Sequence, residues 1–218
     1  MRRIAVLASG RGSNLQALID AIAGGDLAAE VVGVFSDRSR AGAVERARAA
    51  GIPAVSLRPR DFDTRAAFDE ALFSRVDDVQ PDLIVCAGYM RLLSADVVEA
   101  REGRMINIHP SLLPAFKGLH THQLALDAGA TEHGASVHFV TAELDGGPVI
   151  AQARVPVLPD DDVERLSARV LAREHPLLLA TVGALVEGRV RLVDGQVCDH
   201  GRPLAAPLQL GDDDRLLG

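Results

Sequence analysis

The chain has 218 residues, of which 48% are hydrophobic and 24% are charged, and its formal net charge is -7 at pH 7. This length and apolar content are sufficient to bury a core in one domain. The negative charge and the absence of Trp argue against a nucleic-acid-binding protein, which needs a basic surface and usually aromatic side chains that stack on bases. An anionic ligand must therefore be held by local groups.

The sequence also bears on the cellular compartment. No apolar segment approaches the length of about 20 residues that a membrane-spanning helix needs. The apolar run after Arg3 stops at Ser9, which is too short for the core of a signal peptide. Cys86 and Cys198 are the two cysteines, and Cys86 lies in an apolar run, where a thiol behaves as a small hydrophobic group. We therefore expect a cytoplasmic protein that does not contact a membrane.

The first half of the chain alternates strand-like and helix-like runs, which predicts crossover connections and a parallel sheet. The runs at 4–7 and 83–86 are apolar on both faces, as expected for strands that helices cover on both sides. The expected strands span residues 3–8, 30–35, 54–57 and 83–87, and the expected helices span residues 14–23, 43–50 and 64–76.

The second half continues with strands and one long helix, which Pro176 is expected to kink. Asp194 and Gly195 form a dipeptide that accepts positive φ at both turn positions, so the runs beside it predict a hairpin. The expected strands span residues 105–109, 135–140, 149–157, 189–193 and 196–198, and the expected helices span residues 123–128 and 161–186.

Together these patterns predict one α/β domain over residues 1–204, followed by a loose tail at residues 205–218. We expect a mostly parallel, twisted sheet with helices on both faces and a Rossmann-like amino-terminal half.

The segment Ser9-Gly-Arg-Gly-Ser-Asn14 lies between the first expected strand and the first expected helix, where open α/β sheets bind ligands. Glycines let the backbone approach an anion, and free N–H groups with the helix dipole favour a phosphate. A structural alternative is that Ser13 and Gln16 form a capping box and that the glycines only make the turn.

A dinucleotide site is a rival interpretation, because Asp37 follows the second expected strand, where a ribose-binding acid could lie. The dinucleotide fingerprint fails at its third glycine, which is Leu15 here, and no Gly-Lys-Ser/Thr follows as a Walker loop requires. A single terminal phosphate is therefore the favoured ligand.

Asn107 and His109 lie two residues apart in an expected strand, so their side chains face the same side. A carboxamide beside an imidazole suits a tetrahedral intermediate, because the amide can stabilise an oxyanion while the imidazole moves protons. The alternative is that both residues only bond neighbouring loops. Asp145 precedes a glycine and is either a turn residue or a carboxylate that reaches His109 and raises its pKa.

Other catalytic chemistry finds less support. No Gly-x-Ser-x-Gly frame is present, and direct attack by a substrate amine needs no serine nucleophile. His120 and His122 have no carboxylate or cysteine at matching spacing, so we expect no metal site.

At this point the residues resemble the phosphoribosylglycinamide formyltransferase family, from about residue 3 to about residue 193. The resemblance implies transfer of the formyl group of 10-formyltetrahydrofolate to the amine of glycinamide ribonucleotide, by direct attack through a tetrahedral intermediate, in purine biosynthesis. The motifs that carry it are Ser9-Gly-Arg-Gly-Ser-Asn, Gly88-Tyr-Met-Arg-Leu-Leu, Asn107-Ile-His-Pro-Ser-Leu-Leu-Pro, Gly118-Leu-His-Thr-His and Val137-His-Phe-Val-Thr-Ala-Glu-Leu-Asp-Gly-Gly-Pro.

The same resemblance implies the role of individual residues. Asn107, His109 and Asp145 would be catalytic, a triplet shared with other folate-dependent formyl enzymes. The ribonucleotide would be held by Gly12, Ser13, Asn14, Leu171 and Glu174, with Leu171 standing where a polar residue is often found. The folate would be bound by Arg65, Met90, Arg91, Leu92, Leu93, Asn107, Thr141, Ala142, Glu143, Leu144 and Asp145.

Arg65 would meet the carboxylate tail of the folate, and its alternative role is a solvated surface charge. Core packing is the alternative for part of Leu92 and Leu93.

Three other functions are weighed against this one. A formyltetrahydrofolate hydrolase uses similar residues but usually carries an additional amino-terminal regulatory domain. A transfer-RNA formyltransferase is disfavoured because the chain is acidic, and a nucleotide-sensing module is disfavoured because the three reactive residues are present. The oligomeric state, monomer or homodimer, stays open.

Overall fold

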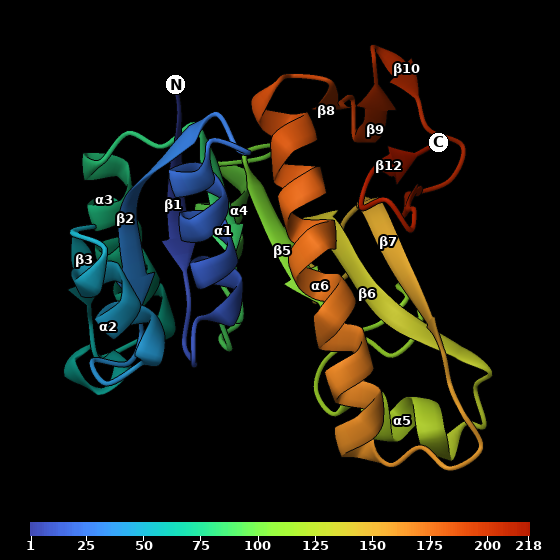
Figure 1. Ribbon diagram of the computed structural model, residues 1–218. Helices are drawn as coiled ribbons and strands as arrows, with labels where there is room; N and C mark the ends of the chain where they lie inside the picture. The colour runs from blue at the N-terminus through green and yellow to red at the C-terminus, as the bar shows by residue number, and fades with distance from the viewer. The chain divides into compact units, whose positions relative to one another are not determined.

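The computed structural model describes residues 1–218, which divide into two compact units, residues 1–107 and residues 108–218. Figure 1 traces the elements of both units. The division falls inside one strand, β5 (Met105–His109).

The first unit is a parallel sheet with strand order β5-β4-β1-β2-β3. Its remaining strands are β1 (Arg2–Leu7), β2 (Ala29–Ser36), β3 (Ala54–Ser56) and β4 (Leu83–Cys86). Its helices are α1 (Ser13–Gly24), α2 (Gly42–Ala49), the 3-10 turn η1 (Pro59–Asp61), α3 (Arg65–Asp78) and α4 (Ala95–Glu99).

Burial explains why this unit is parallel. Residues 4–8 of the chain are fully buried, as expected when helices cover both faces of a strand. With this strand order, the right-handed crossovers that parallel strands adopt place α1 and α2 on one face of the sheet and α3 on the other. Because β1 lies between β2 and β4, the sheet reverses its strand order beside β1, and ligands bind at such a switch point.

The second unit joins an antiparallel pair, β6 (Glu132–Phe139) and β7 (Val149–Pro156), to two helices, α5 (Thr121–Asp127) and α6 (Val163–Val186). Helix α6 runs along β6 and β7 (Figure 1). It continues through Pro176. A three-stranded sheet follows, with β8 (Val190–Val193), β9 (Gln196–Asp199) and β10 (Arg202–Pro203).

The predicted hairpin is confirmed. β8 and β9 pair antiparallel up to Val193 and Gln196. Between them Asp194 and Gly195 have φ of 48° and 76°, as the two central residues of a type I′ turn require.

The prediction of a loose tail is wrong for much of residues 205–218. β11 (Leu208–Leu210) pairs parallel with β7, and β12 (Leu216–Leu217) pairs antiparallel with β11. Leu208 is fully buried, and Arg173 of α6 pairs with Asp214 at 2.9 Å. Leu208 and Leu210 alternate with Gln209, but three residues are too short a pattern to predict a strand. Their burial depends on the surface that β7 and α6 provide.

The capping-box alternative at the start of α1 is also wrong. Gly12 is the N-cap residue, with φ of 77° and ψ of 30°, and no side chain caps the helix. Gln16 instead donates through its side-chain amide to Asp20 and accepts from Arg46. The short elements η1 and α4 are additions that the sequence patterns do not predict. No helix combines the length and the apolar character needed to cross a membrane.

Candidate active site

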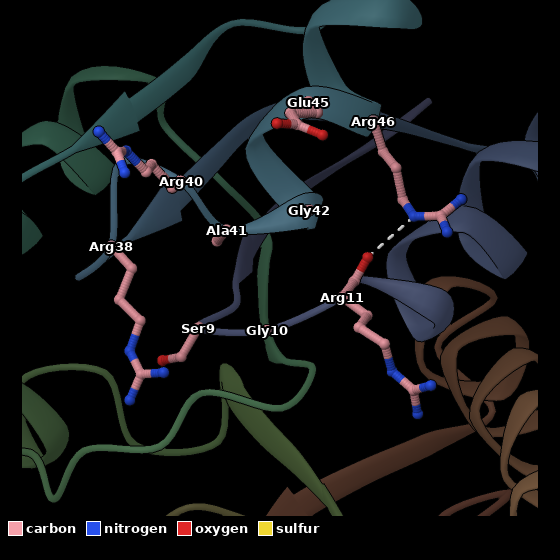
Figure 2. Close-up of a pocket in the computed structure, with 9 residues that line it drawn as sticks. All are labelled: Ser9, Gly10, Arg11, Arg38, Arg40, Ala41, Gly42, Glu45 and Arg46. Atoms are coloured by element: carbon pink, nitrogen blue, oxygen red, sulfur yellow. Dashed lines mark hydrogen bonds between the residues drawn. The ribbon is translucent and has the colours of Figure 1, made fainter.

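The loop between β1 and α1 is fixed by its own backbone and by α2. Ala43 N–H donates to the Gly10 carbonyl at 3.1 Å. A Cβ on Gly12 would lie 2.7 Å from Ala43 Cα, so only glycine permits this approach. Arg46 donates through Nε to the Arg11 carbonyl at 2.9 Å, as Figure 2 shows.

The same loop is tied to the segment after β4. Ser9 N–H donates to the Gly88 carbonyl, and Met90 N–H donates to the Ser9 hydroxyl, both at 3.0 Å. The two loops therefore meet at the switch point of the first unit. Beside this contact Met90 and Leu92 are 57% and 51% exposed, which gives an apolar surface that a flat ligand can cover.

Three further residues of the folate set lie in this unit. Arg91 places its guanidinium 5.0 Å from the centre of the Phe68 ring. Leu93 is half-buried. Arg65 is exposed at the first position of α3, where Thr64 accepts a hydrogen bond from Ala67 N–H and caps the helix.

His109 and Asp145 come together in the second unit. The His109 ring is buried, and its Nδ1 lies 3.5 Å from Asp145 Oδ2. Its Nε2 lies 3.0 Å from the Phe116 carbonyl, to which it donates. Asn107 precedes His109 by two residues in β5, so both side chains project from the same side of the strand.

Asp145 uses both carboxylate oxygens. Its Oδ2 also accepts from Gly118 N–H at 2.9 Å, and its Oδ1 lies 3.6 Å from His138 Nε2. The residue has φ of 46°, a left-handed conformation that Asp tolerates better than most residues. The turn and the carboxylate contact are therefore both realised at this position.

His138 is a neighbour of the site that sequence reasoning missed. Its ring is buried, and Nδ1 donates to its neighbour's carbonyl, that of Phe139, at 2.8 Å. The available signal was a histidine inside the apolar strand run that precedes Asp145, since a buried histidine needs polar partners.

Burial dominates the protonation of His109. It lowers the pKa of His109 below its usual value, although the Phe116 carbonyl and the Asp145 carboxylate both act to raise it. Asp145 therefore acts on the pKa of His109 in the expected direction, but desolvation is larger, so the net pKa lies below its usual value.

Asp145 remains a carboxylate at neutral pH. Burial acts to raise its pKa, but the hydrogen bonds with His138 and with Gly118, together with the two nearby histidines, hold that pKa below its usual value. A neutral imidazole has one N–H and one lone pair. Both ring nitrogens of His109 face oxygen atoms, those of the Phe116 carbonyl and the Asp145 carboxylate. When the ring binds a second proton, each N–H therefore has an acceptor.

Six further predicted residues lie in the second unit, whereas Ser13 and Asn14 form the start of α1 in the first. Thr141 donates through its hydroxyl to the Glu143 carbonyl at 3.5 Å, and the Glu143 carboxylate pairs with Lys117 at 2.8 Å. Ala142 and Leu144 are exposed. Leu171 and Glu174 lie one helical turn apart on α6 and are half-buried.

The two histidines considered for metal binding differ in their contacts. His120 is exposed, whereas His122 Nδ1 lies 3.1 Å from His133 Nε2. No group of three or more His, Cys, Asp and Glu residues is arranged to hold a metal ion.

Comparisons with known proteins agree over most of the chain. The family model described as formyl transferase matches residues 2–182. The phosphoribosylglycinamide formyltransferase of Escherichia coli K12 is 48% identical over 199 residues, which cover 88% of this chain and 94% of that protein. The phosphoribosylglycinamide formyltransferase of Haemophilus influenzae is 40% identical over 204 residues, which cover 94% of this chain and 96% of that protein.

Solved structures give the same result. The phosphoribosylglycinamide formyltransferase of Coxiella burnetii superposes with a TM-score of 0.90 at 46% identity, covering 94% of this chain and 96% of that one. The chain therefore belongs to the formyl transferase family. It is a transferase, and the predicted α/β fold class is confirmed.

Proposed function

We propose that this chain transfers the formyl group of 10-formyltetrahydrofolate to the amine of glycinamide ribonucleotide, a step of purine biosynthesis. The observation that carries the proposal is that a glycine loop suited to phosphate and a buried His109–Asp145 pair occur in one chain. The relatives at 40% and 48% identity bear the name of this activity.

In the proposed reaction the substrate amine attacks the formyl carbon, and the carbonyl oxygen becomes an oxyanion. Asn107 donates its carboxamide N–H to that oxygen. The amine loses one proton and the departing folate nitrogen gains one, so the reaction needs a group that passes a proton between them. His109 performs this transfer while Asp145 balances the charge of the imidazolium.

Binding of the two substrates is divided among the predicted residues. The phosphate would lie against Gly12, Ser13 and Asn14, where the N–H groups at the start of α1 favour an anion. Leu171 and Glu174 would contact the same substrate. The pterin would cover the apolar side chains of residues 90–93 and the backbone of residues 141–145, and Arg65 would meet the carboxylate tail.

We also propose a cytoplasmic setting with these two small molecules as partners. Both cysteines, Cys86 and Cys198, are free and buried, which fits a reducing compartment.

The test is to mix the protein with 10-formyltetrahydrofolate, with and without glycinamide ribonucleotide, and to follow both products. We expect folate deformylation only with the amine present, and one formylated ribonucleotide for each folate released. A substrate analogue without the phosphate is the matched control and should need a much higher concentration. Equal folate turnover without the amine would instead identify a formyltetrahydrofolate hydrolase.

A further inference from the structure

Six arginines line two adjoining cavities in the first unit. The larger cavity, of about 580 Å³, lies beside the loop after β1, and Figure 2 draws the residues around it. The second, of about 430 Å³, shares Arg38 and Arg40 with the first. We call the set the arginine band, and its members are Arg11, Arg38, Arg40, Arg46, Arg58 and Arg60.

The arginine band carries more positive charge than its surroundings neutralise. Arg58 pairs with Asp61 at 2.8 Å, and Arg38 Nε lies 3.8 Å from Asp37 Oδ2. Glu45 also lines the larger cavity but pairs with none of the six. Six guanidinium groups thus face three carboxylates in a chain of net charge -7.

Four of the six arginines in the band have no acidic partner. Arg11, Arg40 and Arg60 are exposed side chains, and none makes an ion pair. Arg46 donates to neutral acceptors, the Arg11 carbonyl and the Gln16 side chain. These groups keep their charge, because arginine does not deprotonate in proteins, and each can bind phosphate oxygens in a bidentate manner.

Helix α2 in the cavity wall adds a smaller positive potential to that of the arginines. Helix α2 begins at Gly42, and no side chain caps it. The N–H groups of Ala43 and Val44 already donate to the Gly10 and Ala41 carbonyls, so it is mainly the helix dipole that favours an anion at this end. A Cβ on Gly42 would lie 2.9 Å from the Arg11 carbonyl, so this close backbone contact excludes larger residues.

The arginines point in different directions. In Figure 2 the side chains of Arg11 and Arg38 extend the same way on the two sides of the Ser9–Gly10 segment, whereas Arg40 leaves the backbone away from it. Arg40 then shares the second cavity with Arg58 and Arg60. The arginines thus line two cavities that share Arg38 and Arg40, an arrangement that favours a ligand with more than one anionic group.

We propose that the arginine band binds a diphosphate or triphosphate group, either free or as part of a nucleotide. The single phosphate of the proposed ribonucleotide substrate is assigned to Gly12, Ser13 and Asn14, and none of these lines either cavity. The band is therefore a second anion site, which uses Arg11 from the first part of the substrate loop and otherwise extends away from Gly12, Ser13 and Asn14.

The test is titration calorimetry with three probes: inorganic phosphate, pyrophosphate and adenosine diphosphate. We expect one saturable site, with pyrophosphate at least about tenfold tighter than inorganic phosphate and weaker binding at higher salt. Equal affinities for pyrophosphate and the nucleotide identify the diphosphate as the recognised group. A tighter nucleotide shows that the nucleoside also contributes, and both results support the site.

Arg40→Ala and Arg60→Ala should each weaken pyrophosphate about tenfold, the loss of one hydrogen-bonded charged contact. Arg75→Ala, an exposed arginine of α3 outside the band, is the control and should leave binding unchanged. Without pyrophosphate, formyl transfer should be normal in all three variants, which separates this site from the proposed activity. No saturable binding, or equal affinities in wild type and both band variants, would overturn the proposal.

Discussion

The loop after β1 is built mainly from backbone groups, whereas the centre around Asp145 is built from buried side chains. In the loop, Gly12 accepts a left-handed conformation and Arg46 fixes the backbone from α2. Around Asp145, two histidine rings lie within ion-pair distance of one carboxylate. The loop should therefore control substrate affinity, and the Asp145 centre should control turnover and its pH dependence.

Asn107→Ala should have the largest effect on turnover. Loss of one donor to an oxyanion typically lowers turnover by roughly 100-fold to 1,000-fold. We expect that fall in kcat with smaller changes in both KM values, measured by steady-state kinetics. Near wild-type kcat with weaker substrate binding would make Asn107 a binding residue only.

Asp145→Asn should lower kcat by roughly tenfold to a hundredfold, less than general acid–base catalysis contributes as a whole. The asparagine oxygen can still accept from Gly118 N–H, so the turn should persist. Because the Asp145 charge acts to raise the pKa of His109, its removal should move the His109 limb of the pH–rate profile to lower pH. An unchanged profile would separate Asp145 from the protonation of His109.

Arg46→Ala tests whether the loop after β1 controls substrate affinity. Arg46 holds the loop through Arg11 and Gln16, so we expect an increase of about tenfold in KM for the ribonucleotide, with kcat and the pH profile unchanged. Arg46→Lys should recover part of the loss. Arg48→Ala is the matched control, an exposed arginine of the same helix. An equal rise in KM for the folate would show a general loss of structure.

Arg65→Ala should have the smallest effect. An exposed charge contact contributes about 1 kcal/mol or less, so folate affinity should fall by no more than about fivefold while ribonucleotide affinity stays constant. Titration calorimetry with each substrate measures both, and Arg75→Ala serves as the control on the same helix. Unchanged folate affinity would remove Arg65 from the folate site.

The sequence predicted most elements because their signals are local. Apolar runs at 4–7 and 83–86 identified two buried strands, and the Asp194–Gly195 pair identified its hairpin turn. The spacing of Asn107 and His109 likewise predicted that their side chains project from the same side of one strand, β5. The glycine-rich segment before Asn14 predicted the loop between β1 and α1, and the binding of an anion by this loop stays a prediction.

Only the tertiary structure decided the features that depend on distant residues. The pKa of His109 reflects how deeply the ring is buried, and no local pattern gives that depth. The packing of residues 205–218 depends on the open edge of β7. The arginine band joins residues that are far apart in the sequence, because Arg38 shares one cavity with Arg11 and the other with Arg60 only after the crossovers of the first unit have formed. The sequence by itself determined the elements and the reactive groups, because those depend on neighbours in the chain. The protonation of the reactive groups, and the residues that surround them, depend on neighbours in space.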